Sequence, residues 1–165
     1  MNCGNGKSPS NSTHHNYEPL ISVSANDDEF IRRLNGLLFS VMSWQQLTDF
    51  WSKIDRNGGW YLYAIGEALP ESPASTEQVH LFIEKIDALL RHDHHESYCG
   101  IVYADNLEQA DFVKIYDPNH LGSSCGSSKN TPLPGWVMSK IAPTELTAKW
   151  TLPANRKRWW QSLFE

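Results

Sequence analysis

The chain has 165 residues, of which 40% are hydrophobic and 20% are charged, as is typical of one soluble domain with its own apolar core. Its net charge of −5 disfavours general nucleic-acid binding, which depends on clustered Lys and Arg. Residues 34–42 form the longest strongly apolar stretch, which is too short to span a bilayer. Residues 1–19 lack the apolar centre of a secretory signal, so the sequence predicts a cytoplasmic protein without a membrane partner.

The N-terminal part of the chain predicts a tail and two helices. Residues 1–18 are rich in Asn, Ser, Gly and His, which predicts a disordered tail before a single α+β domain over 19–165. Asn26 and Glu29 form a capping-box pair, and apolar residues at helical spacing predict a first helix that reaches Val41. Ser43 and Gln46 repeat the pattern ahead of a second helix, which we expect to end at residues 57–59.

The middle of the chain alternates between strand and helix patterns. Residues 60–66 are aromatic and aliphatic and lie between glycines, which predicts a strand covered on both faces. Ser75 and Gln78 form another capping box, and the apolar residues from Val79 to Leu90 predict a long amphipathic helix.

Two further strands are predicted at residues 98–104 and 112–116, joined as an antiparallel hairpin. Strand alternation counted from Cys99 places Cys99, Ile101 and Tyr103 on one face. Residues 117–135 predict a long loop, because they combine several Gly and Pro residues with many serines.

The C-terminal part is less regular. Residues 136–141 fit either a strand or a helical turn, and residues 155–164 predict a short helix. The predicted fold is therefore α+β, with a short antiparallel sheet of three to four strands, helices packed on one face, and an irregular C-terminal third.

The loop after the second hairpin strand contains two familiar patterns that fail in context. Residues 122–126 match G-x-S-x-G, but no predicted helix follows, as a nucleophile elbow requires. Residues 122–129 resemble a phosphate-binding loop, yet the spacing is wrong and again no helix begins there. A weaker hypothesis is left open, in which backbone amides and Lys129 hold a small anion.

Histidines and cysteines flank the predicted hairpin at one end of the sheet. An antiparallel arrangement would bring the start of one strand close to the end of the next. Imidazole and thiolate groups are ligands of transition metals, so a metal site is one hypothesis, and a second treats Cys125 as a nucleophilic or redox thiol with His120 as its base. Solvated histidines explain the same pattern. The residues concerned are His92, His94, His95, Cys99, His120 and Cys125, with His94, His95, His120 and Cys125 as the proposed metal set.

Aromatic and basic residues gather near the C-terminus, where Trp159 and Trp160 follow Arg156, Lys157 and Arg158. Tryptophan near arginine is typical of interfaces, but the segment could equally dock onto the protein's own core. The leading functional hypothesis is a non-catalytic binding or accessory protein that engages a protein or small ligand through the 117–135 loop and the C-terminal segment. The binding residues it implies are Asp117, Asn119, His120, Ser123, Ser124, Cys125, Lys129, Trp159 and Trp160.

Overall fold

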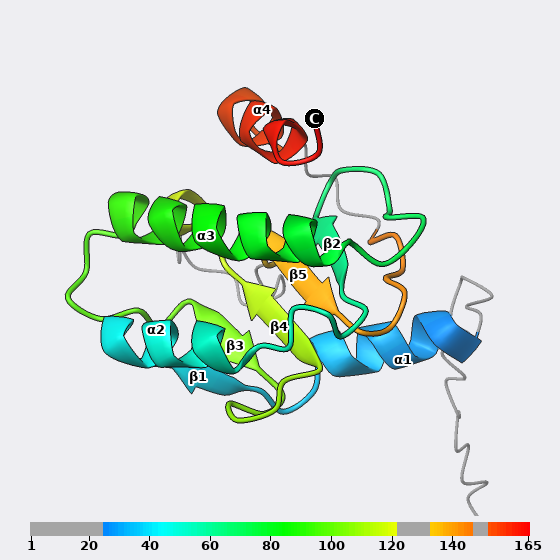
Figure 1. Ribbon diagram of the computed structural model, residues 1–165, viewed down its shortest axis with the longest axis horizontal. Coiled ribbons are helices and arrows are strands. Elements are labelled where there is room, and N and C mark those ends of the chain that lie inside the picture. Colours follow the sequence, from blue (N-terminus) through cyan, green and yellow to red (C-terminus); the bar gives the residue numbers. More distant parts are fainter. Residues whose placement is uncertain (1–24, 122–132, 147–151) are drawn as a thin grey trace, which may run out of the picture.

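The computed structural model describes residues 25–121, 133–146 and 152–165 (Figure 1), and the described chain contains a five-stranded antiparallel sheet. Along the sheet the strands follow the order β1-β3-β4-β5-β2, so β4 is central and β1 and β2 are the edges. The α+β class is confirmed, and the sheet has one strand more than the three to four predicted. The strands are β1 (Phe39–Val41), β2 (Tyr61–Ala64), β3 (Val102–Ala104), β4 (Phe112–Ile115) and β5 (Trp136–Ser139).

The described helices are α1 (Ala25–Leu34), α2 (Trp44–Lys53), α3 (Thr76–Asp93), the short 3-10 turn η1 (Pro118–His120) and α4 (Ala154–Ser162). Two of them begin where the sequence predicts. Ahead of α2, the Ser43 hydroxyl accepts a hydrogen bond from the backbone N–H of Gln46 at 2.9 Å. Ser75 and Gln78 cap α3 reciprocally, at 3.1 and 2.9 Å, so both boundaries are set by local side-chain chemistry.

The predicted first helix is wrong in its second half. Helix α1 ends at Leu34, and residues 39–41 form edge strand β1, paired with β3. A Cβ at Gly36 would lie 2.9 Å from the Arg32 carbonyl oxygen, so the chain leaves the helix through a position that suits glycine. Leu37 is 84% exposed, so this residue fits the helical spacing of apolar residues without being part of a buried helix face. Backbone pairing with β3 overrides that spacing.

The sheet separates two apolar clusters. The larger one joins Leu62, Val113 and Met138 of the sheet to residues of α2, α3 and α4. The smaller one places Phe30 and Leu34 of α1 against alternate sheet residues, including Phe112 and Val137. Three helices thus share one face, as expected. The prediction that all helices pack on that face is wrong for α1, because the apolar side chains of α1 pack on the other face, against Phe112 and Val137.

Strand β3 differs from the predicted alternation. Cys99 and Ile101 lie in the larger core together with Val102 and Ala104, whereas Tyr103 points to the opposite face. The backbone bends at Gly100, whose φ is +68°, and the regular strand begins only at Val102. Counting from Cys99 therefore places Tyr103 on the wrong face.

The C-terminal third contains more regular structure than predicted, because residues 136–139 form β5 between β4 and β2. Within the described ranges, no helix is long and apolar enough to cross a membrane.

Candidate functional site

A buried ion-pair centre lies where the end of α3, the η1 turn and α4 meet. Arg156 donates two parallel hydrogen bonds to Asp117, from Nε to Oδ2 and from Nη2 to Oδ1, both at 3.0 Å. Its Nη2 also donates to Oδ2 of Asp93 at 2.7 Å. Arg156 is 5% exposed and Asp117 is 4% exposed, so the central pair is removed from water.

Each member of this centre is positioned by the end of an element. Asp93 is the last residue of α3, Asp117 caps η1 and Arg156 lies in the first turn of α4. Asp117 Oδ1 also accepts the backbone N–H of Asn119 at 2.9 Å. The carboxylates are thus engaged by protein donors, and the centre ties α4 to the rest of the domain.

The charges of the centre stabilise one another. Burial alone would raise the pKa of Asp93, but hydrogen bonds from His92 and Arg156 outweigh it and hold that pKa below its usual range. Burial alone would lower the pKa of Arg156, and the hydrogen bonds to Asp117 and Asp93 outweigh it and raise that pKa. The ionised forms of Asp93 and Arg156 are therefore the native ones.

The lowered pKa of Asp93 predicts a loss of stability in acid. Because its folded pKa lies below the ordinary value of 3.8, the contribution is complete at neutral pH and disappears as pH falls through the folded pKa. Urea unfolding of the wild type and of Asp93→Asn between pH 7 and 3 would measure this contribution of Asp93 to stability. The variant should be less stable at neutral pH and should lose less stability below about pH 4. Identical pH slopes for the two proteins would contradict this role for Asp93.

The histidines of the predicted metal set have separate environments. His94 is buried at the C-terminus of α3, where its Nε2 lies 2.9 Å from the Cys99 carbonyl oxygen and its ring meets Trp44 and Tyr98 edge to face. His92 and His95 are exposed, and His92 pairs with Asp93. His120 is half-buried at the end of η1.

These residues do not gather into a metal-binding group within the described part of the chain, where no set of three or more His, Cys, Asp or Glu side chains could hold an ion. Cys125, with Ser123, Ser124 and Lys129, lies outside the described residues. The metal and thiol hypotheses that include Cys125, and the anion-loop hypothesis, stay predictions. Cys99 is a free, buried thiol whose pKa is raised by burial, which disfavours the reactive thiolate there.

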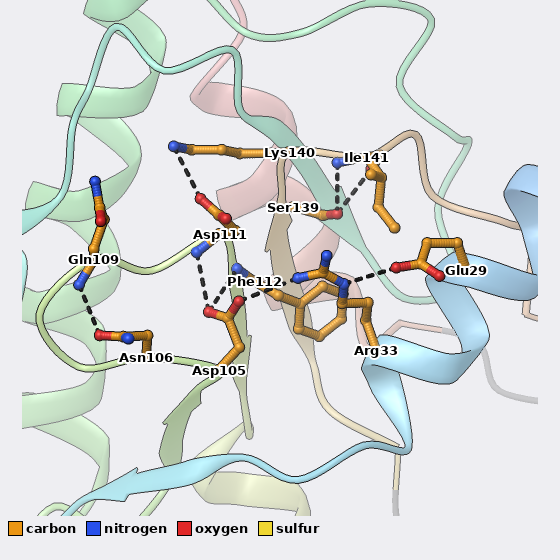
Figure 2. A network of polar contacts seen from close by, with 10 residues as sticks. All are labelled: Glu29, Arg33, Asp105, Asn106, Gln109, Asp111, Phe112, Ser139, Lys140 and Ile141. Carbon is orange, nitrogen blue, oxygen red and sulfur yellow. Dashed lines mark hydrogen bonds and ion pairs between the residues drawn. The ribbon is translucent and has the colours of Figure 1, made fainter.

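A second polar network lies at the opposite end of the sheet (Figure 2). Arg33 of α1 donates to Glu29 at 3.0 Å and to Asp105, just after β3, at 3.2 Å. Asp105 accepts hydrogen bonds from the backbone N–H groups of Asp111 and Phe112, at 3.0 and 3.1 Å. These contacts close the β3–β4 turn and hold α1 against it, so a structural role accounts for them.

The C-terminal helix docks onto the protein's own core, one of the two alternatives that the sequence left open. Trp160 is 8% exposed and meets Phe82 of α3 edge to face, with ring centroids 6.1 Å apart. Trp159 is half-buried and meets Trp136 at 5.5 Å. Trp160 therefore supports the fold, and it is available to a ligand only from within a groove.

That groove has a volume of about 260 Å³ and lies between α4, the start of α3 and the connection that follows β2. Trp160 and Phe164 form its α4 side, and Pro70 and Pro73 belong to the connection. Its lining contains no charged residue. The remaining lining residues are Leu62, Ala68, Ser72, Ala74 and Gln78.

Sequence reasoning missed Arg156 as a buried residue, although a pattern could have found it. Leu152, Arg156, Trp160 and Leu163 are buried together and follow helical spacing, so Arg156 belongs to the apolar stripe.

Comparison of this chain with protein-family models, with curated proteins and with solved structures gives no match.

Proposed function

We propose that this is a non-catalytic binding or accessory protein that captures an apolar side chain of a protein partner in the groove beside α4. The observation that supports this most directly is the uncharged lining with Trp160 at one side and Phe164 at the rim. Phe164 is 42% exposed and Leu69 beside the groove is also exposed. Exposed apolar residues around an aromatic-lined hollow are typical of protein interfaces.

The size of the groove favours a side chain over a cofactor. Sites for small molecules usually measure roughly 300 to 1,000 Å³, and this groove, at about 260 Å³, falls below that range. An uncharged lining offers no cationic partner to a phosphate or a carboxylate. One or two apolar side chains of an inserted segment fit both the volume and the chemistry.

The walls of the groove are preorganised. Two prolines restrict the backbone of the connection, and the Gln78 side chain is held by its hydrogen bond to the Ser75 amide. The opposite wall is fixed because α4 is held by Arg156 and by the buried ring of Trp160. A rigid site loses less conformational entropy on binding.

Site-specific photocrosslinking tests the proposal. A benzophenone amino acid at Ser72, in the groove, should give one dominant crosslinked partner in cells, and the same group at exposed Gln45 on α2 should not. The partner would then be identified, purified and titrated against the protein. We expect Phe164→Ala to weaken that purified interaction by about tenfold, the equivalent of about 1.4 kcal/mol.

Phe39→Ala provides the matched control, because Phe39 is a similarly exposed phenylalanine, at 51%, on edge strand β1. Its affinity should equal that of the wild type. Equal weakening by both substitutions, or a partner that binds Phe164→Ala normally, would contradict binding in the groove.

The predicted surface also includes the 117–135 loop, of which residues 122–132 lie outside the described residues, so binding by this loop stays a prediction. A cytoplasmic location belongs to the same proposal, and it is supported by the buried free thiol of Cys99.

A further inference from the structure

Lys114 occupies an unusual place for a lysine, on the central strand of the sheet. Strand pairing sets up one cross-strand row in which Ser40 opposes Tyr103, Tyr103 opposes Lys114, and Lys114 opposes Val137. Val137 belongs to the part of this face that α1 covers. Lys114 therefore lies at the border between the covered part and the part formed by β1 and β3.

The ammonium group of Lys114 lies near two aromatic rings and a backbone carbonyl oxygen. Its Nζ lies 5.7 Å from the ring centroid of Tyr103 and 5.5 Å from that of Tyr116, and it donates one hydrogen bond, at 3.3 Å, to the Leu34 carbonyl oxygen at the end of α1. Among the described residues no carboxylate pairs with it.

Lys140 shows what a structural lysine looks like in the same protein. Its Nζ also lies over an aromatic ring, 5.3 Å from the centroid of Trp60, but it forms an ion pair with Asp111 at 3.1 Å. The two lysines differ in that no carboxylate of the described residues pairs with Lys114. A half-buried charge without such a partner is a candidate for a functional group.

The face of the sheet that carries Lys114 has further polar groups with unused hydrogen-bonding capacity. The Ser40 hydroxyl oxygen is buried and has no hydrogen-bond partner within the described chain. Burial lowers the pKa of the Lys114 ammonium and raises the pKa of the Tyr116 hydroxyl, so Tyr116 keeps its proton at neutral pH and can donate it in a hydrogen bond. Tyr103 and Tyr116 are only half-buried, so their rings are accessible in part.

We propose that Ser40, Tyr103, Lys114 and Tyr116 form a binding site for a small aromatic carboxylate. The carboxylate would pair with the Lys114 ammonium and accept hydrogen bonds from neighbouring hydroxyl groups. The ligand ring would pack against the two tyrosine rings, which already meet edge to face at 5.7 Å. This site is independent of the groove beside α4.

The charge at this face selects a ligand with one negative charge. Lys114 is the one cation placed over the Tyr103 and Tyr116 rings among the described residues. A single ammonium balances one carboxylate, whereas a nucleic-acid backbone needs several cations along its path. The adjacent aromatic surface favours a planar, apolar ligand body over a small hydrated anion such as acetate.

The test is a titration of the isotope-labelled full chain with benzoate, followed by amide chemical shifts. Saturable shifts should appear at Ser40, Tyr103 and Lys114, and benzamide and acetate should bind at least about tenfold more weakly. Lys114→Met, which keeps an unbranched side chain without its charge, should weaken the binding of benzoate by about tenfold or more. Lys140→Met is the matched control and should bind benzoate like the wild type.

Three outcomes would overturn the proposal: no saturable shift with benzoate, equal binding of benzamide and benzoate, or equal binding by Lys114→Met. If Lys114→Met unfolds, the ligand series on the wild type decides the question, because only the carboxylate distinguishes benzoate from benzamide. The crosslinking result at Ser72 is unaffected by either outcome, since the two sites use different residues.

Discussion

Replacement of Arg156 by methionine is expected to destabilise the fold by about 3 to 5 kcal/mol, because it leaves the buried carboxylate of Asp117 and the partly buried carboxylate of Asp93 without their cation. Asp117 loses both hydrogen bonds of its bidentate pair, and Asp93 loses its bond to Nη2. Lysine at this position should recover only part of the loss, since an ammonium cannot reproduce the planar fork of a guanidinium. Chemical denaturation at neutral pH measures both variants.

The neighbouring arginine supplies the control. Arg158 is exposed, so Arg158→Met should change the free energy of unfolding by less than about 0.5 kcal/mol. The double variant Arg156→Met with Asp117→Leu should be more stable than Arg156→Met alone, because it removes the buried, unpaired carboxylate of Asp117. An Arg156→Met protein as stable as Arg158→Met would show that the buried ion pair does not hold α4.

Truncation of Trp160 should have an effect of similar size. Trp160→Ala removes a ring that packs against Phe82 and against Phe164, whose centroid lies 4.8 Å away. The loss of such a buried aromatic side chain costs about 3 to 5 kcal/mol, which includes the cavity left behind. Thermal and urea unfolding of the variant would measure it.

Phe164→Ala separates this packing role from binding. Phe164 lies at the rim of the groove and is partly exposed, so its loss should cost much less stability than the loss of Trp160. If both variants unfold at the wild-type denaturant concentration, Trp160 is not a core residue.

Removal of the whole C-terminal segment should also destabilise the fold. A truncation after Pro153 removes Arg156, Trp160 and Leu163 together, all of which are buried. We therefore expect truncation to lower the melting temperature, and point substitutions at the rim report on binding more cleanly. An unchanged melting transition would show instead that α4 is dispensable for the fold.

The sequence correctly predicted elements whose boundaries depend on short-range chemistry. The caps at Ser43 and Ser75 involve residues three positions apart, and the apolar stripe of α3 repeats within one helix. The β3–β4 hairpin was also correct, because its strands are neighbours along the chain. The predicted extent of the first helix was wrong, because its second half forms β1, which pairs with residues of β3 far away in the sequence.

The same distinction holds for the candidate sites. The sequence indicated that the end of α3 and the segment after β4 meet at one end of the sheet, and Asp93 and Asp117 do meet there through Arg156. Arg156 lies 63 residues from Asp93 and 39 residues from Asp117 in the sequence. No local pattern pairs charges over such distances, because the pairing depends on where α4 docks.

The sequence by itself determined the α+β class, the two capped helices, the hairpin and the aromatic character of the sheet. Each follows from periodicity or capping within a few residues. Only the tertiary structure decided that β1 joins the sheet, that Arg156 is buried, and that Lys114 lies over two tyrosine rings with no carboxylate partner in the described part of the chain. Strand order and helix docking create these contacts, and they depend on the simultaneous packing of segments that are distant in the chain.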